Sequence, residues 1–308
     1  MEFEKGIVKK VLLTGASGLV GAKLIKSLLN KGFEVAVLSR TPSSFPLINA
    51  YQWDISKQEM DLKALEGVDT IIHLAGAGIA DKRWTKSRKQ EIIDSRVEST
   101  RLLYKSIRLT KAPIKTFISA SATGFYGDRN DEILNEESNA GSGFLAECCR
   151  QWEDAVSEGS SMGIRVVKLR IGVVLSRRGG ALSELSRPVN LFVGAALGSG
   201  KQWMPWIHLK DLVSIFEKSI ENHDLTGTFN ACSPFPVTNL EFTKILAKKL
   251  FRPVWPIRVP SFVLKLLLGE MSSVILNSNR CNPQRIIDSG FRFRYLYLED
   301  ALNEIYKH

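Results

Sequence analysis

The stretch "VLLTGASGLVGAKL" (residues 11–24) decides the fold of this 308-residue chain. A short apolar run ends at Thr14, and Gly15, Gly18 and Gly21 follow at intervals of three. Apolar residues then recur at helical spacing. Glycines between a strand and a helix permit a tight turn, bring the backbone close to a pyrophosphate and let the helix pack on the strand. The stretch predicts a dinucleotide-binding strand–turn–helix unit, and its alternative is a tight turn without a ligand.

The rest of the chain alternates in the same way. Apolar segments predict strands at 33–40, 51–54, 69–76, 115–121 and 164–175, and helices at about 86–109 and 143–158. Nearly continuous apolar strands separated by helices indicate a parallel sheet covered on both faces. We therefore expect an α/β fold, a Rossmann-type doubly wound parallel sheet with a smaller C-terminal α/β substrate lobe.

The composition changes after Leu175. Residues 176–201 are rich in Gly and Ser, and prolines concentrate in "SPFPVTN" and "RPVWPIRVPSF". Residues 203–233 predict a strand, a helix and a strand that return to the main sheet. We expect an NADP-binding Rossmann domain at 1–175 plus 202–233, and a smaller substrate-binding lobe at 176–201 plus 234–308.

The net charge, the cysteines and the apolar stretches indicate which kinds of partner the protein does not bind. The formal net charge is +10, but the basic residues are scattered and no aromatic interleaving marks a nucleic-acid surface. The four cysteines form no C-x-x-C pair, which predicts reduced thiols and no metal site. No apolar stretch is long and uninterrupted enough to span a bilayer, and "MEFEKGIVKK" has no apolar signal region. We expect a cytoplasmic protein that binds neither nucleic acid nor membrane.

Three further segments complete a predicted cofactor site. "VAVLSR" ends in Ser39 and Arg40, and an arginine after the second strand suits a 2′-phosphate, which favours NADP(H). Asp54 either accepts from the adenine amino group or caps a turn. "HLAG" ends in small residues that let backbone pass beside a cofactor, with His73 expected in the core. The cofactor-binding residues predicted from these segments are Gly15, Ala16, Ser17, Gly18, Leu19, Val20, Gly21, Ser39, Arg40, Asp54, Leu74, Ala75 and Gly76.

The order "TGASGLVG", "IIHLAGAG", "FISASATGFYGD", "LRIGVVL" and "WIHLKDL" resembles the extended short-chain dehydrogenase/reductases, the NAD(P)-dependent epimerase/dehydratase family. The segments "AGAGIADKRW", "SRVEST" and "CRQWE" are similar to an atypical subgroup whose members are called epimerase family proteins and whose substrate is uncertain.

The resemblance implies roles for three residues. Ser121 would orient a substrate carbonyl or hydroxyl, or bond to backbone as a strand-end hydroxyl. Tyr126 would donate a proton, or serve shape and cofactor contact. Arg170 would lie on the nicotinamide side, or form a strand-end salt bridge. Ser121 and Tyr126 are the predicted catalytic residues, and Arg170 is a further predicted cofactor-binding residue.

The chain departs from the resemblance in one helix. The superfamily carries a tyrosine and, four residues later, a lysine that holds the nicotinamide ribose and lowers the tyrosine's pKa. In "GFLAECCRQWEDA" these positions hold Phe144 and Cys148, or in the next register Leu145 and Cys149. Such a stripe predicts core packing, with a catalytic cysteine as the alternative.

Two functions stay open on this basis. The first is an NADP(H)-dependent oxidoreductase or epimerase-like enzyme that acts on a small carbonyl or hydroxyl substrate, with a sugar-nucleotide-like compound as one alternative. The second is a non-catalytic NADP(H)-binding sensor or regulatory protein, which the missing tyrosine and lysine favour. By analogy with the superfamily, we expect a homodimer formed through the helices at about 86–109 and 143–158.

Overall fold

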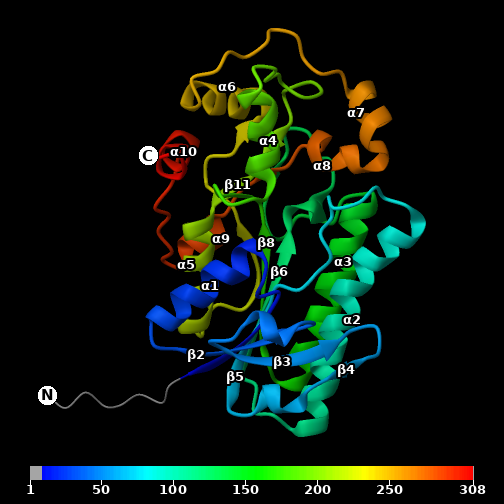
Figure 1. Ribbon diagram of the computed structural model, residues 1–308, viewed down its shortest axis with the longest axis vertical. Helices are drawn as coiled ribbons and strands as arrows, with labels where there is room; N and C mark the ends of the chain where they lie inside the picture. Colours follow the sequence, from blue (N-terminus) through cyan, green and yellow to red (C-terminus); the bar gives the residue numbers. More distant parts are fainter. Residues whose placement is uncertain (1–8, 308) are drawn as a thin grey trace, which may run out of the picture.

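The computed structural model describes residues 9–307, and its centre is an eight-stranded sheet (Figure 1). The strand order is β12-β8-β6-β5-β1-β2-β3-β4. Neighbours pair in parallel except β3 and β4, which are antiparallel. The strands are β1 (Lys10–Thr14), β2 (Glu34–Ser39), β3 (Asn49–Asp54), β4 (Glu59–Met60), β5 (Val68–His73), β6 (Thr116–Ala122), β8 (Arg165–Ile171) and β12 (Gly227–Ala231). The predicted Rossmann-type α/β fold is confirmed.

Helices cover both faces of the sheet, as the apolar strands predict. Helices α1 (Leu19–Asn30) and α5 (Leu209–Glu221) lie together on one face, and α2 (Lys86–Thr110) and α3 (Phe144–Ser157) on the other (Figure 1). Side chains of β1 alternate between the two cores: Val11 and Leu13 pack towards α1, whereas Leu12 packs towards α2. Because successive residues of a strand face opposite ways, a strand buried on both sides is apolar throughout.

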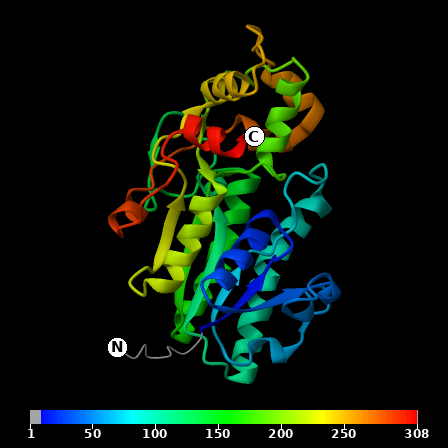
Figure 2. The same cartoon turned by 60° about the vertical axis from the view of Figure 1, so that its left-hand side comes forward.

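The C-terminal half adds a third core above the carboxyl ends of the strands. Figure 2 shows the gold and orange helices of residues 239–268 on that side of the sheet. The core joins α4 (Ala181–Asn190), α6 (Asn239–Lys249) and α10 (Leu298–Ile305), and the other helices are α7 (Ser261–Leu268), α8 (Ser273–Leu276) and α9 (Gln284–Asp288). Short strand pairs connect this part: β10 (Trp203–Met204) with β13 (Val237–Thr238), and β14 (Arg280–Cys281) with β7 (Ile133–Leu134). The domain boundaries inferred from the sequence stay a prediction.

The strand expected at 164–175 is two strands. β8 ends at Ile171, and β9 (Val173–Leu175) leaves the main sheet and pairs with β11 (Trp206–His208). Between them, a Cβ on Gly172 would lie 2.5 Å from the Pro205 carbonyl oxygen, so a second chain segment crosses there in close contact. Of the two strands expected within 203–233, only β12 therefore returns to the main sheet. The apolar run conceals this break because both halves are mainly apolar.

Among residues 9–307, no helix combines the length and the apolar character that crossing a membrane requires.

Candidate functional site

The strand order reverses between β1 and β5, and the glycine turn lies at this point. β1 pairs with β2 on one side and with β5 on the other, so the chain leaves β1 towards one half of the sheet and later returns to build the other half. Open α/β sheets bind ligands outside the carboxyl ends of their strands at such a reversal. The glycine turn between β1 and α1 lies at this edge, as does the end of β5 (Figure 1).

Gly15 and Gly21 are required by close contacts between backbone segments. Gly15 has φ +71°, and a Cβ there would lie 2.6 Å from the carbonyl carbon of Leu74. A Cβ on Gly21 would overlap the carbonyl oxygen of Gly15. Gly18 is less constrained, because its Cβ would lie 3.3 Å from that oxygen. The turn is thus packed between α1 and the segment after β5.

The N-terminus of α1 is open to an anion. Gly18 is its N-cap, no side chain caps the helix, and its first turn contains no acidic residue. The first N–H groups of a helix lack partners within it and favour negative charge. In the predicted phosphate-binding segment, Ala16 is buried, Ser17 is exposed, and Leu19 and Val20 are half-buried. These residues fit a pyrophosphate group, and their contact with one stays a prediction.

The predicted adenine-side residues follow β2 and β3. Arg40 is exposed directly after β2, and the Ser39 hydroxyl accepts from the Thr41 N–H at 3.1 Å. Asp54 Oδ1 accepts from the Ser56 N–H at 2.9 Å and from its hydroxyl at 2.6 Å, and these bonds, the hydroxyl one foremost, lower the pKa of Asp54. Asp54 therefore caps its turn, and its adenine contact stays a prediction.

Thr14 and His73 fix the backbone at the end of β5. The Thr14 hydroxyl oxygen accepts from the N–H groups of Leu74 and Ala75, both at 3.2 Å, and lies 2.8 Å from His73 Nδ1. Thr14 must then donate its proton to Nδ1, which leaves the proton of the neutral imidazole on Nε2, 3.0 Å from the Ser99 hydroxyl. Burial lowers the pKa of His73 to about 3. His73 is a core residue, as expected, and it orders the predicted segment Leu74 to Gly76.

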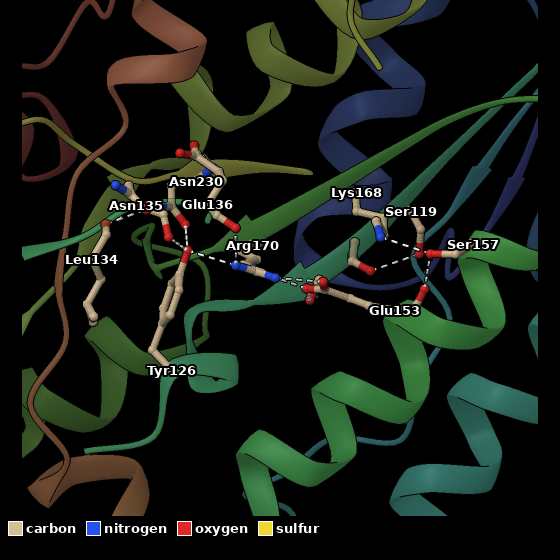
Figure 3. Close-up of polar contacts among 12 residues, drawn as sticks. Ser119, Tyr126, Leu134, Asn135, Glu136, Glu153, Ser157, Lys168, Arg170 and Asn230 are labelled. Carbon is tan, nitrogen blue, oxygen red and sulfur yellow. Dashed lines mark hydrogen bonds and ion pairs between the residues drawn. The ribbon is translucent and has the colours of Figure 1, made fainter. Parts of the chain in front are cut away.

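A buried ion pair joins α3 to β8, and a hydroxyl group at the end of β6 donates to the same carboxylate (Figure 3). Arg170 on β8 donates from Nε and Nη2 to the two carboxylate oxygens of Glu153 on α3, both at 2.9 Å. The Ser121 hydroxyl at the end of β6 donates to the same carboxylate at 2.6 Å. The exposed fractions of Ser121, Glu153 and Arg170 are 3, 5 and 4%. Arg170 thus forms the strand-end salt bridge, and its nicotinamide contact stays a prediction. Ser121 uses its proton on Glu153, and its oxygen remains able to accept.

Tyr126 is fully buried and its hydroxyl is saturated (Figure 3). The hydroxyl oxygen accepts from Arg170 Nη1 at 3.0 Å. Its single proton faces two acceptors, the Asn135 carbonyl at 2.8 Å and the Asn230 Oδ1 at 2.7 Å. Burial raises the pKa of Tyr126 above its ordinary value. This geometry favours the structural alternative, while proton donation by Tyr126 stays a prediction.

Removing the Tyr126 hydroxyl tests this description. We expect Tyr126→Phe to lower the free energy of unfolding by about 1–3 kcal/mol, because Arg170 loses an acceptor and the two buried oxygens lose the one proton that they share. Urea-induced unfolding measures the change. Tyr306→Phe is the control, since Tyr306 is only half-buried near the C-terminus. Equal stability of Tyr126→Phe and the unmodified protein would contradict the saturated network.

Helix α3 presents no polar group at the positions where the superfamily carries its acid and cation. Cys148 and Cys149 are 4 and 5% exposed, and burial raises the pKa of both thiols, that of Cys149 to about 12. Both therefore remain thiols at neutral pH, which disfavours the nucleophile alternative and favours core packing.

A cavity of about 920 Å³ begins at the N-terminus of α3 and extends beneath α7 and α8. Its apolar lining includes Trp84, Phe144, Leu145 and Leu276, and its more numerous polar residues include Asp128, Gln202, Lys265 and Glu270. A concave site that combines apolar walls with convergent polar groups is typical of small-molecule binding.

Sequence reasoning assigned no role to Glu153 or Asn230. A signal for Glu153 was present, because it lies four residues after Cys149 on the buried stripe of α3, where a carboxylate needs a partner. Asn230 gave no such signal. Its partners Leu134 and Asn282 come from distant segments, joined only by the fold.

Comparison with known proteins agrees with this architecture. Residues 11–232 match the NAD dependent epimerase/dehydratase family, and residues 259–305 match a domain of unknown function, DUF1731. The epimerase family protein ML0860 of Mycobacterium leprae is 35% identical over 295 residues, which cover 95% of this chain and 94% of that protein.

Solved structures give the same result. The human epimerase family protein SDR39U1, determined with NADPH, has a TM-score of 0.84 and 29% identity, covering 96% of this chain and 98% of that chain. A nucleoside-diphosphate sugar epimerase from Corynebacterium glutamicum has a TM-score of 0.79 and 36% identity, covering 97% of this chain and 58% of that chain. The chain therefore belongs to the NAD dependent epimerase/dehydratase family, within the extended short-chain dehydrogenase/reductase superfamily.

Proposed function

We propose that the protein is an NADP(H)-dependent oxidoreductase or epimerase-type enzyme that acts on a small carbonyl or hydroxyl compound. The observation that carries the proposal is the glycine turn at the strand reversal, with an uncapped helix N-terminus beside it and Arg40 at the end of β2. The human relative determined with NADPH supports the same cofactor. When bound, a nicotinamide supplies or accepts a hydride.

The cavity at the start of α3 supports a small-molecule substrate. Its Trp84, Phe144 and Leu145 walls suit the apolar part of a compound, while the Lys265 ammonium offers donors to its oxygen atoms. Ser121 would accept a hydrogen bond from a substrate hydroxyl, because its own proton is held by Glu153. The proton that accompanies hydride transfer would come from a water or from the substrate itself, since the Tyr126 proton is held between the Asn135 carbonyl and Asn230 Oδ1.

The missing tyrosine and lysine of α3 favour a second candidate, a non-catalytic NADP(H)-binding regulator. Titration with NADPH and NADH, followed by incubation of the NADPH complex with a panel of carbonyl compounds, separates the two. Loss of the reduced nicotinamide absorbance with any compound supports the enzyme. Tight binding without oxidation across the panel supports the regulator, and binding of neither dinucleotide contradicts both.

Replacing Arg40 tests the choice of cofactor. We expect Arg40→Asp to weaken NADPH binding about 10–100-fold, because a charge-assisted bond to the 2′-phosphate contributes roughly 1.5–3 kcal/mol. NADH lacks that phosphate, so its affinity should change little. Arg108→Asp changes the net charge equally from an exposed position near the end of α2 and serves as the control. Equal losses for both dinucleotides would show that Arg40 does not recognise the phosphate.

A further inference from the structure

Helices α4 and α6 end in the same unusual way. At both ends, the second residue beyond the cap donates its N–H to the carbonyl five residues earlier, at 2.9 Å, which is the bond of a left-handed helix cap. The residue in the left-handed conformation is Phe192 after α4, with φ +64°, and Phe251 after α6, with φ +54°. Glycine ordinarily occupies this position, because a side chain there strains the backbone. Each helix therefore carries a large aromatic side chain where the fold alone favours none.

The two phenylalanines do not pack in the core. Their exposed fractions are 53% for Phe192 and 87% for Phe251. They nevertheless belong to one surface, because the Arg252 Cζ lies 4.4 Å from the centre of the Phe192 ring, and Trp255 Nε1 donates to the Phe192 carbonyl at 2.7 Å. Strained residues that add nothing to the core point to a role outside the fold.

Further exposed apolar side chains surround these two. They come from the end of α4 and from the loop between α6 and α7, and we call the set the apolar tip: Leu191, Phe192, Val193, Phe251, Trp255 and Ile257. The loop leads into α7, which exposes Phe262 and Leu266 one turn apart. Figures 1 and 2 both show the loop of residues 250–260 at the extremity of the molecule. Exposed apolar residues grouped in this way mark an interaction surface.

The charge of the segments that carry the apolar tip is entirely positive. Residues 185–201 contain two basic residues and residues 242–269 contain six, and neither segment contains an aspartate or a glutamate. Two of these cations form ion pairs with carboxylates outside the segments, Arg187 with Glu184 and Lys248 with Glu299. In the described part of the chain, Arg252 and Arg258 form no ion pair. The apolar tip therefore suits an anionic partner.

This charge disfavours a second copy of the chain as the partner. A two-fold dimer through the apolar tip would place the surface against itself, so that like charges would oppose one another. An acidic protein would satisfy the charge, but the apolar side chains stand on helix ends and on a loop at the extremity of the molecule (Figure 1). Side chains that protrude in this way can enter a deformable lipid surface, where aromatic and basic residues act together.

We propose that the apolar tip binds the surface of an anionic lipid bilayer. Phe192, Phe251 and Trp255 would enter the headgroup region, while Arg252, Arg258 and the neighbouring lysines would contact lipid phosphates. The expectation that the protein binds no membrane rested on the lack of a spanning stretch, and binding at the surface requires none. This assignment also accounts for phenylalanine at two positions where glycine would relieve the backbone.

Sedimentation of the full chain with lipid vesicles tests the proposal. We expect the protein to bind vesicles of phosphatidylcholine mixed with phosphatidylglycerol about 10–100-fold more tightly than vesicles of phosphatidylcholine alone, and to release them as the salt concentration rises. The double variant Phe192→Gly, Phe251→Gly should bind the anionic vesicles about 10–100-fold more weakly. Its midpoint of thermal unfolding should be equal to that of the unmodified protein or higher, because glycine removes the strain.

Two single variants separate the apolar and the electrostatic contributions. Ile257→Ser removes an exposed loop side chain, and Arg258→Gln removes a charge, and each should weaken binding to the anionic vesicles about fivefold. The matched controls are Leu109→Ala and Arg108→Gln, at exposed positions near the end of α2, and both should bind like the unmodified protein.

Three results would overturn the assignment. The first is a failure to bind anionic vesicles, including the case in which the chain dimerises through the apolar tip instead. The second is equal binding by the glycine and serine variants and the unmodified protein. The third is a clearly lower midpoint of thermal unfolding in the double variant, which would show that the two phenylalanines serve the fold.

Discussion

Replacing Glu153 with alanine should lower the free energy of unfolding by about 3–5 kcal/mol, because it leaves the buried Arg170 guanidinium without its counter-charge. Arg170 is 4% exposed and directs two of its nitrogens at the Glu153 carboxylate. Ser121 would lose its acceptor in the same variant. The midpoint and slope of urea-induced unfolding measure the effect.

Two comparison variants make the Glu153 test specific. Glu158→Ala removes an exposed carboxylate that lies 3.4 Å from Arg101, and should cost at most about 1 kcal/mol. The double variant Glu153→Met, Arg170→Met removes both charges and should be more stable than Glu153→Ala alone, because no unpaired buried charge remains. A cost below about 1 kcal/mol for Glu153→Ala would show that Arg170 is solvated and that the pair does not hold β8 to α3.

Gly15→Ala should lower the free energy of unfolding by about 2–5 kcal/mol, combining the cost of a left-handed conformation with that of overpacking. The added methyl would meet the backbone of Leu74 and Ala75, which cannot turn away as a flexible side chain could. The same change should abolish NADPH binding, because the turn and the segment after β5 would have to separate. Urea-induced unfolding and titration with NADPH measure the two effects.

Alanine at the two neighbouring glycines should cost different amounts of stability, so these variants serve as comparisons for Gly15→Ala. Gly21→Ala should resemble Gly15→Ala, since its methyl would overlap the Gly15 carbonyl oxygen. Gly18→Ala should cost only about 0.5–1 kcal/mol of stability, the ordinary penalty for alanine at an N-cap. If all three variants were equally stable, the packing of the turn against β5 would be refuted.

The sequence was sufficient to predict the elements whose signals are local. Gly15, Gly18 and Gly21 predict the turn from a stretch of fewer than ten residues. The apolar strands predict a sheet that is covered by helices on both faces. The family resemblance likewise rests on short contiguous motifs. The lack of the superfamily's tyrosine and lysine in α3 was also evident from the sequence, since neither register offers a phenol or an ammonium.

The sequence was insufficient wherever a partner comes from a distant segment. The break at Gly172 depends on the Pro205 carbonyl, which crosses from another element. The saturation of Tyr126 depends on Asn230, 104 residues away.

The contact between the glycine turn and the end of β5 affects how much of the folded protein a cell contains. Thr14 and Leu74 lie 60 residues apart in the chain, so the unfolded polypeptide contains no cofactor cradle. A ligand that binds only the native state adds to its stability by mass action, about 2.7 kcal/mol at a concentration 100 times its dissociation constant. If the cradle holds NADP(H), the abundance of the protein and its resistance to proteolysis follow the concentration of the free dinucleotide. The concentration of the nucleotide would then set how much of the protein escapes degradation, whether or not the protein catalyses a reaction with it.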